Sequence, residues 1–438
     1  MLFTDSIVAL SSGHLPSGVA IIRISGPHVR FAIETILGKL PKARLAHYGA
    51  LHRQSGELLD HGLTLFFPGP SSFTGEDCGE FHVHGGRAVV AALLAELTRI
   101  PGLRHAEPGE FTRRAFLNGK MDLLAAEALA DLINAETEAQ RQFAVLNSSG
   151  AQSELYSAWR RRLIHARAMI EAEMDFADEA DVPSSVSGQV WRDISLLVGE
   201  MKQHLGGYHK AEMIRDGYDV VILGAPNAGK SSLLNALLQR EAAIVTDEPG
   251  TTRDLVEAVL ELDGLKVRIT DTAGLREPSG KVEAIGVDRA KQRAQRADLV
   301  LHLEDMSTSA ADIELPTSVH AIHIGNKLDR AAAQQAPKRY DLCISTATGE
   351  NIGSLLQMIG AAAFQAAGTK GEILPSRLRH VELLAEGLRH LEGSLANQPL
   401  ELRSEELRLA TDRIGRLSGA VDVEDLLDVI FSQFCIGK

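Results

Sequence analysis

The segment "GAPNAGKS", residues 224–231, restricts the fold of this chain more than any other segment. It matches the phosphate-loop pattern G-x-x-x-x-G-K-[ST]. The apolar run "YDVVILG" leads into it and the amphipathic run "SSLLNALL" leaves it, as expected of a loop that joins a buried strand to a helix. The first N–H groups of such a helix bind phosphate oxygens. The sequence therefore predicts a P-loop nucleotide-binding domain.

Two side chains of this loop have expected roles. Lys230 bridges the terminal phosphates, and the Ser231 hydroxyl is a ligand of Mg²⁺. The backbone of the surrounding loop is expected to contact the same nucleotide. The predicted nucleotide-binding residues of the loop are Asn227, Ala228, Gly229, Lys230, Ser231 and Ser232.

Two later motifs complete the predicted phosphate and metal site. "TTRD" supplies Thr252 as a second hydroxyl on Mg²⁺. "DTAG" follows the strand-like run "KVRIT", so that Asp271 holds the metal through water and the N–H of Gly274 contacts the γ-phosphate. Thr272 and Ala273, between these two residues, belong to the same predicted site.

The motif "NKLD" predicts which base is bound. Asp329 accepts hydrogen bonds from N1–H and the 2-amino group of guanine, Lys327 contacts the nucleotide, and Asn326 supports the loop. Adenine lacks these paired donors, and an unpaired buried carboxylate discriminates by roughly 10⁴-fold or more. Backbone groups of Ser345, Thr346 and Ala347 complete the base pocket. Alone, "NKLD" is as well explained by a polar turn, but four motifs in this order predict a GTPase.

The residue after "DTAG" is Leu275, where Ras-like GTPases have a glutamine that orients the attacking water. A leucine cannot polarise water, so the catalytic group must lie elsewhere. Candidates in the following segment are Arg276, Glu277 and Glu283, although each of them also reads as a solvated loop charge.

Changes in the hydrophobic pattern along the sequence predict a multidomain α/β chain. Residues 1–118 are rich in short strand-like runs such as "VAIIRISG" and "LTLFF", which favours a β-rich α+β domain. Residues 119–215 and 374–438 have helical periodicity. Residues 216–373 alternate strand and helix, which predicts a Ras-like domain with a mostly parallel sheet. The simplest arrangement inserts this G domain into one helical domain.

Bulk properties favour a soluble cytoplasmic protein. The three cysteines (Cys78, Cys343 and Cys435) form an odd set without metal-like spacing, which indicates reduced thiols. No run is long and apolar enough for a membrane span, and the first residues do not resemble a signal peptide. The formal net charge of −13 argues against general coating by nucleic acid but permits a local basic patch.

The motifs taken together resemble those of the tRNA-modification GTPase family MnmE, also called TrmE. The resemblance rests on the P-loop with Asn227, "GTTRD", "DTAGLRE", "NKLD" and the terminal "FCIGK". The N-terminal runs "SFTGED", "HGG" and "PGEFTRRAFLNGKMDL" extend it over the whole chain.

Membership of this family implies an N-terminal domain that forms a homodimer and binds a reduced folate, 5-formyl- or methylene-tetrahydrofolate. The positions that match the family's folate contacts are Arg23, Glu80, Lys120 and Lys438. A carboxylate suits adjacent N–H and amino donors of a pterin, and cations suit its carbonyl and glutamate oxygens. A zinc site at Cys78, His82 and His84, with His105 nearby, competes with this interpretation, but the segment has no second Cys pair.

The resemblance also implies an activity and a partner. Together with a flavin-dependent protein of the MnmG (GidA) type, in a heterotetramer, the family adds an aminomethyl-type (carboxymethylaminomethyl) group to C5 of the wobble uridine of certain tRNAs. One rival is a regulatory GTPase in ribosome assembly, which the GTPase motifs fit equally well. Another is a folate-dependent one-carbon transferase that acts on a small molecule.

For GTP hydrolysis, the family implies a bound K⁺ in place of an arginine finger. Its ligands are the Asn227 side chain and carbonyls of the loop 246–251, including those of Thr246, Glu248 and Thr251. Thr246 is therefore also counted with the nucleotide site. Pairing of two G domains would complete the site, and Glu283 would orient the attacking water. Arg253 and Arg276 remain alternative cations.

Cys435, four residues from the end, has two interpretations. If Lys438 reaches the folate, the tail folds back onto the N-terminal domain and places a thiolate near the one-carbon unit. That thiolate could attack C6 of the uracil ring or serve a redox step. A purely structural anchor is the alternative.

Overall fold

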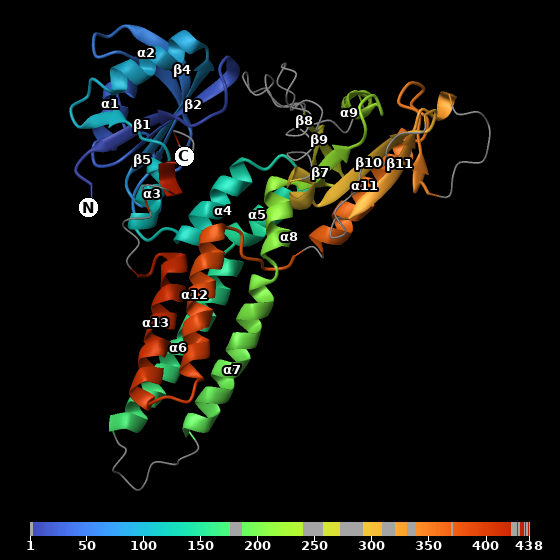
Figure 1. Ribbon diagram of the computed structural model, residues 1–438. Helices are drawn as coiled ribbons and strands as arrows, with labels where there is room; N and C mark the ends of the chain where they lie inside the picture. The colour runs from blue at the N-terminus through green and yellow to red at the C-terminus, as the bar shows by residue number, and fades with distance from the viewer. Residues whose placement is uncertain are drawn as a thin grey trace, which may run out of the picture. The chain divides into compact units, whose positions relative to one another are not determined.

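The computed structural model describes residues 3–175, 186–239, 257–271, 292–308, 320–330, 339–368 and 371–421, together with residues 427, 430–432, 434 and 437. The chain divides into two compact units (Figure 1). The first consists of Met1–Ala130, Ser153–Ala168 and Leu407–Lys438, and the second of Asp131–Gln152 and Met169–Glu406. The domain boundaries near residues 118, 215 and 373 stay predictions. In the part that the structure describes, no helix has both the length and the apolar content to cross a membrane.

A sheet of six described strands lies at the centre of the first unit, in the order β3-β4-β5-β2-β1-β6. Its strands are β1 (Ser6–Leu10), β2 (Ser17–Ser25), β3 (His47–His52), β4 (Leu58–Phe67), β5 (Cys78–Gly85) and β6 (Leu103–His105). The pair β1 and β6 is parallel, and the other neighbours are antiparallel. The runs predicted as strands lie in β2 and β4, which confirms a β-rich N-terminal region.

The two faces of this sheet differ in burial and polarity, because successive side chains along each strand point to opposite faces. Ile22, Ile24 and Phe81 are fully buried in one core with α1 (Val29–Leu37) and α2 (Arg87–Leu97), which lie together against the sheet (Figure 1). On the opposite face of β2 and β5, the side chains of Arg23, Glu80 and His82 are partly exposed, whereas Ser25 and Cys78 are buried. A third helix, α3 (Glu110–Leu117), packs with β1 through Phe111 and Ile7.

Long helices make up most of the rest of the chain outside the second sheet. They are α4 (Leu123–Ile133), α5 (Glu138–Ser148), α6 (Ala151–Asp175), α7 (Val186–Leu205), α8 (Tyr208–Asp216), α12 (Leu378–Ser394) and α13 (Leu400–Ser418). Helix α5 begins with a capping box in which the side chains of Thr137 and Gln140 accept from each other's backbone N–H groups. Within the second unit, α7 packs on α12, and Lys202 forms an ion pair with Glu392 at 2.7 Å. These helices confirm the helical periodicity predicted for residues 119–215 and 374–438 where the structure describes them.

The second unit contains the predicted mostly parallel sheet, in the order β12-β11-β10-β7-β9-β8. Its strands are β7 (Tyr218–Leu223), β8 (Glu257–Leu262), β9 (Leu265–Asp271), β10 (Leu299–Asp305), β11 (Ala321–Asn326) and β12 (Leu342–Cys343). Only the described pair β8 and β9 is antiparallel, because the two-residue turn Asp263–Gly264 connects them. Both turn residues have positive φ (53° and 82°), as a tight hairpin requires.

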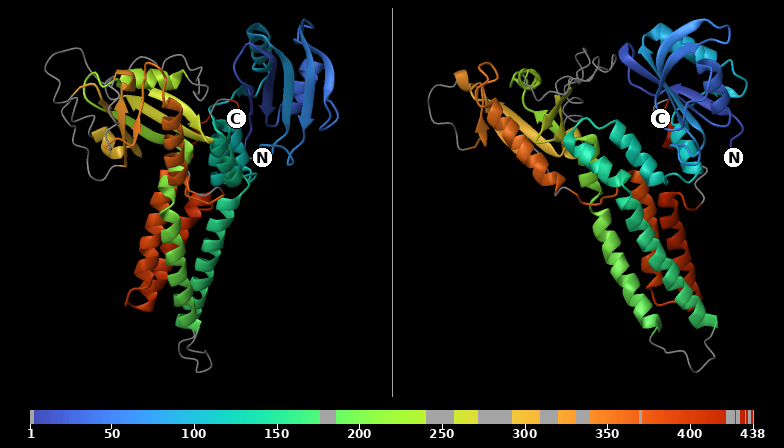
Figure 2. Two further views of the ribbon diagram at one scale, coloured as in Figure 1. Left: turned by 90° about the vertical axis from the view of Figure 1, so that its right-hand side faces the viewer. Right: turned by 180° about the vertical axis from the view of Figure 1, so that it is seen from behind.

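One apolar core supports the nucleotide end of this sheet. Helices α9 (Lys230–Leu238) and α11 (Ile352–Ala367) pack on the same face, and Figure 2 shows α11 running along the strands. Each of α9, α11 and β10 contributes a fully buried leucine to this core, namely Leu233, Leu355 and Leu301. Because the strands are parallel, the carboxyl ends of β7, β9, β10 and β11 meet at one edge, which is where such sheets bind ligands.

Candidate functional site

The P-loop spans the gap between β7 and α9, as the sequence predicts. Gly229 caps α9 with φ 98°, and a Cβ on it would lie 2.3 Å from Nδ2 of Asn326, so no larger residue fits there. The Asn326 amide in turn donates to the Ala228 carbonyl at 2.8 Å. Asn227 is exposed with φ 66°, and Ser232 is exposed in the first turn of α9. The first N–H groups of α9 have no partner inside the helix and are available to a phosphate.

Lys230 and Ser231 occupy the positions that phosphate and metal chemistry requires. The Lys230 ammonium donates to the carbonyls of Gly224 (2.8 Å) and Ala225 (3.0 Å), which holds it across the loop. Ser231 Oγ donates to Oδ2 of Asp271 at 2.6 Å, and Asp271 is fully buried at the end of β9. A hydroxyl beside a carboxylate is the oxygen donor set that Mg²⁺ prefers. The two residues therefore fit a Mg²⁺ ion that also binds nucleotide phosphates.

The predicted base pocket is assembled by hydrogen bonds between its two loops. Ser345 Oγ donates to Oδ1 of Asp329 at 2.6 Å, which orients the carboxylate. Thr346 N–H donates to Oδ1 of Asn326 at 3.3 Å, so Asn326 joins the base pocket to the P-loop. Ala347 is exposed at the mouth of the same turn. Among the described residues, the second oxygen of Asp329 has one charged neighbour, Nε of Arg330 at 3.8 Å.

Asp305, which the sequence analysis did not identify, supports the same pocket. It ends β10 beside Asn326 of β11, and its carboxylate accepts from Lys327 Nζ at 2.6 Å and from Ser307 Oγ at 2.6 Å. Burial opposes ionisation of Asp305, but the hydrogen bonds from Lys327 and Ser307 outweigh it and lower the pKa of Asp305. A signal was present in the sequence, since an acidic residue at the end of a predicted strand next to "NKLD" must face that motif.

On the accessible face of the N-terminal sheet, two predicted folate residues pair directly. Arg23 of β2 lies opposite Glu80 of β5, and their side chains approach to 2.9 Å. His82 contacts the other Glu80 oxygen at 3.2 Å. The Arg23 guanidinium lies 5.5 Å from the centre of the Phe73 ring. The cluster combines a carboxylate, a cation and an aromatic face, which suits a planar heterocycle with amino and carbonyl groups.

Lys120 approaches the same loop from a different side. Its Cγ lies 3.2 Å from where a Cβ would stand on Gly75, two residues from Phe73. The loop is fixed from below by the fully buried Arg114, which pairs with Glu76 at 3.3 Å and with Glu110 at 3.0 Å. The motifs "SFTGED" and "PGEFTRRAF" thus form one buried ion cluster that positions the loop between Arg23 and Lys120.

The end of the chain returns to the N-terminal sheet. Ser11 Oγ donates to the carbonyl of Gly437 at 2.7 Å. Gly437 has φ 97°, and a Cβ on it would stand 2.1 Å from the Leu10 carbonyl oxygen. Phe431 and Phe434 are buried against α4. The tail is therefore held next to the sheet that bears Arg23 and Glu80, as expected of a tail that folds back.

The histidines of β5 and the nearby thiol each have separate partners. Cys78 is buried beside Thr74 (3.1 Å), and His84 contacts Asp60 at 2.8 Å. Within the described residues, no group of three or more His, Cys, Asp or Glu is placed to hold a metal ion.

The other predicted site residues lie outside the described residues. They are Thr246, Glu248, Thr251, Thr252, Arg253, Thr272, Ala273, Gly274, Arg276, Glu277, Glu283, Cys435 and Lys438, and Leu275 lies outside them as well.

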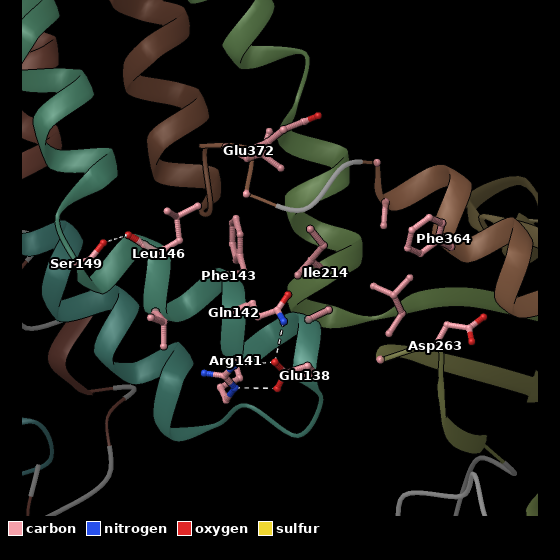
Figure 3. A pocket seen from close by; sticks show the side chains of 18 residues that line it. Glu138, Arg141, Gln142, Phe143, Leu146, Ser149, Ile214, Asp263, Phe364 and Glu372 are labelled. Carbon is pink, nitrogen blue, oxygen red and sulfur yellow. Dashed lines mark hydrogen bonds and ion pairs between the residues drawn. The ribbon is translucent and has the colours of Figure 1, made fainter.

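A cavity of about 540 Å³ lies where helix α5 meets the G-domain sheet (Figure 3). Phe143, Leu146, Ile214 and Phe364 give it a mainly apolar lining. Beside it, the N–H of Ala139 donates to the Gly264 carbonyl at 3.0 Å, and the Lys266 ammonium pairs with Glu136. Strand β9 therefore contacts helix α5 at one end and holds Asp271 at the other.

Family models account for almost the whole chain. The model described as "GTP-binding protein TrmE N-terminus" matches residues 6–120, and that described as "MnmE helical domain" matches residues 123–435. The second match spans the G domain, which agrees with a helical domain interrupted by an insertion.

Curated relatives agree with these matches. A protein of Mesorhizobium japonicum named tRNA modification GTPase MnmE is 62% identical over 443 residues, and the alignment covers 100% of both chains. A protein of the same name from a Chelativorans species is 57% identical, covering 99% of this chain and 98% of its own.

Among solved structures, an Aquifex aeolicus Era variant bound to GDP and aluminium fluoride is 26% identical and covers 41% of this chain and 68% of its own. Its TM-score of 0.26 gives the fold no independent support.

The sequence identity of this chain to the curated relatives over their full length decides the family. The chain belongs to the MnmE family of tRNA modification GTPases.

Proposed function

We propose that this GTPase hydrolyses GTP to drive a step in the modification of wobble uridines in tRNA, in the cytoplasm where its substrates are found. The observation that supports the GTP site best is the position of Asn326, which contacts the P-loop through Ala228 and the base pocket through Thr346. Base recognition by Asp329 and phosphate binding by the P-loop are thereby coupled through one buried amide. Ser231, Thr252 and Asp271 would hold Mg²⁺.

The N-terminal cluster of Arg23, Glu80 and Phe73 is proposed to bind the pterin of a reduced folate, with Lys120 and Lys438 on its glutamate oxygens. The folate would supply the one-carbon unit of an aminomethyl-type group at C5 of the uridine. Support comes from the pairing of Arg23 with Glu80 at 2.9 Å and from the loop of Gly75 that also contacts Lys120. The position of Gly437 against Ser11 supports a role for neighbouring Cys435 at this site.

Homodimerisation through the N-terminal domain and a flavin-dependent MnmG-type partner complete the proposal. Hydrolysis is proposed to need K⁺, bound by Asn227 and by carbonyls of the loop 246–251 when two G domains pair, while Glu283 orients water. The exposure of Asn227 supports this role, because an exposed side chain in the P-loop is open to an ion. Equal hydrolysis rates in KCl and NaCl at matched ionic strength would instead favour Arg253 or Arg276.

One reconstitution tests the proposed function. The full-length protein is mixed with the flavin-dependent partner, a reduced folate, GTP, and tRNA from a strain that lacks the gene, and the nucleosides are then analysed by mass spectrometry. We expect C5-modified wobble uridine only when GTP and folate are both present. Unmodified tRNA, together with a ribosome-assembly defect in the deletion strain, would support the rival regulatory GTPase.

A further inference from the structure

The described parts of α6 and α13 in the first unit carry a local excess of positive charge. Residues 153–168 and 407–421 contain seven arginines and only two acidic residues, Glu154 and Asp412, in a chain whose formal net charge is −13. The arginines are Arg160, Arg161, Arg162, Arg167, Arg408, Arg413 and Arg416. Asp422, Glu424, Asp425 and Asp428 follow in the sequence, outside the described residues. Within the described segments the concentration of arginine favours a polyanion, because binding follows the local field and not the total charge.

A cavity of about 240 Å³ lies between these two helix segments. Its lining is more polar than apolar and includes Ser157, Arg160 and Arg161 from α6 and Ser418 at the end of α13. Tyr156 also lines it, but only 1% of this side chain is exposed, so its ring cannot stack on a base. The cavity therefore offers donors for an anionic group and no surface that would read a nucleobase.

Arg160 is the cation of this cavity that remains available. Arg161 forms an ion pair with Glu154 at 2.6 Å. Arg160 has no hydrogen bond or ion pair with any described residue, and its Nε is buried without a partner. Nε is covered by protein atoms and cannot reach a ligand, so the terminal guanidinium nitrogens, which have no partner among the described residues, are the donors that this cavity offers to an acceptor.

A glycine inside α13 makes room for this side chain. A Cβ on Gly415 would lie 3.1 Å from Nε of Arg160 and 2.7 Å from Cγ2 of Val421. Glycine is unfavourable in a helix interior, so its presence three residues before the end of α13 needs a packing reason. Here the reason is that the Val421 side chain and Nε of Arg160 both pack against the helix backbone at this position.

We propose that this cavity binds a backbone phosphate of the tRNA substrate, with the Arg160 guanidinium as its principal donor and the Ser157 hydroxyl as a second. A planar guanidinium donates two parallel hydrogen bonds to phosphate oxygens, and such contacts position a nucleic acid without reading its sequence. Arg161 lines the same cavity, and the arginine-rich sequence of the two segments favours a polyanion over a free nucleotide. The proposal rests on the proposed function, since it names the surface that holds that substrate.

The test measures tRNA binding by the full-length protein over a range of KCl concentrations. Arg160→Gln is expected to weaken binding about 5- to 10-fold and to reduce the slope of log K against log[salt] by about 1. Arg141→Gln is the matched control, because it removes the same charge from an exposed ion pair with Glu138 in the other unit. GTP hydrolysis should be unchanged in both variants. Equal binding by the Arg160 variant and the control would overturn the proposed site while leaving the function intact.

A second variant and a second ligand separate the other outcomes. Gly415→Ala should shift both Val421 and the guanidinium, and we expect it to lower tRNA affinity with Arg160 still present. Inorganic phosphate is titrated in parallel, and a phosphate affinity that depends on Arg160 while tRNA binding does not would overturn the RNA assignment in favour of small phosphates. If the wild-type protein bound no tRNA under any condition, both the site and the proposed function would be wrong.

Discussion

The hydroxyl of Ser231 donates a hydrogen bond to the Asp271 carboxylate across 2.6 Å, joining the first turn of α9 to the end of β9. These segments are 40 residues apart in the chain. A Mg²⁺ ion bound by the hydroxyl would be held by Asp271 through water, so the carboxylate sets both the position and the charge of the metal site. The pair therefore has to act as one unit.

Asp271→Asn should raise the Mg²⁺ concentration needed for GTP hydrolysis about 10- to 100-fold, the usual cost of losing an outer partner of a metal ligand. The amide keeps the size of the side chain but removes its charge. Binding of GDP in the absence of Mg²⁺ is the control and should change little. An unchanged Mg²⁺ requirement would remove Asp271 from the metal site.

Ser345→Ala should weaken GTP binding by about 10- to 150-fold, the effect of one hydrogen bond to a charged group. The reason is that Asp329 loses the 2.6 Å contact that orients its carboxylate toward guanine. Affinity for ATP should not change, so the ratio of the two dissociation constants, measured by fluorescence titration, reports the effect. Loss of both affinities in parallel would indicate a folding defect instead.

The GTP site was predictable because its residues are local motifs at the ends of strands. Asn326 ends β11, and Asp329 and Ser345 follow β11 and β12, while their contacts with guanine stay a prediction. Phe73 was not predictable, since its contact with Arg23 depends on how a loop folds over a sheet. Arg23 and Glu80 were predicted to contact folate only because the chain resembles the MnmE family. Their pairing follows from the register of β2 with β5, over 57 residues, which composition and periodicity do not fix.

The same limit applies to contacts between helices. Helical periodicity predicts the segments that became α6 and α13, but it does not predict that Arg160 lies over Gly415. Side chains far apart in sequence meet only once the helices are packed. Asp305 is easier to predict than a contact between helices. Once β10 and β11 are known to be neighbours, their ends place Asp305 near Lys327.

His204 should make the stability of the second unit depend on pH. Burial, followed by the nearby His380, lowers the pKa of His204 from 6.5 to about 4, although a hydrogen bond with the Ile373 backbone opposes the shift. Between these two values the unfolded chain binds a proton that the folded protein does not, so acid favours unfolding. The contribution of His204 is complete above pH 6.5 and is lost as the pH falls toward 4.

The measurement is the free energy of unfolding at several pH values for wild type and His204→Gln, which keeps an N–H donor but does not titrate. The wild type should lose about 1–3 kcal/mol more than the variant across this range. His14→Gln, a substitution of an exposed histidine in the other unit, is the control and should follow the wild type. Parallel curves for wild type and His204→Gln would contradict the assignment.

Gly437→Ala should separate GTP hydrolysis from tRNA modification. Its φ of 97° is unfavourable for alanine, and the added methyl would stand 2.1 Å from the Leu10 carbonyl, so the tail must leave the position where Ser11 holds it. If Cys435 and Lys438 act at the sheet of Arg23 and Glu80, as proposed, displacement of Gly437 would remove them from that site. We expect modification in the reconstituted system to fall at least about tenfold, the size of effect that misplacement of a reacting group produces.

Hydrolysis should continue at the wild-type rate in this variant, because the P-loop lies in the other unit. Gly13→Ala provides the control, since Gly13 lies in the same domain with no atom within 4 Å of a Cβ placed there. Cys435→Ser completes the comparison. If the thiol reacts, it should lose modification as Gly437→Ala does. If Cys435 is only an anchor, the serine variant should modify tRNA normally while Gly437→Ala fails, which would assign the whole effect to the position of the tail.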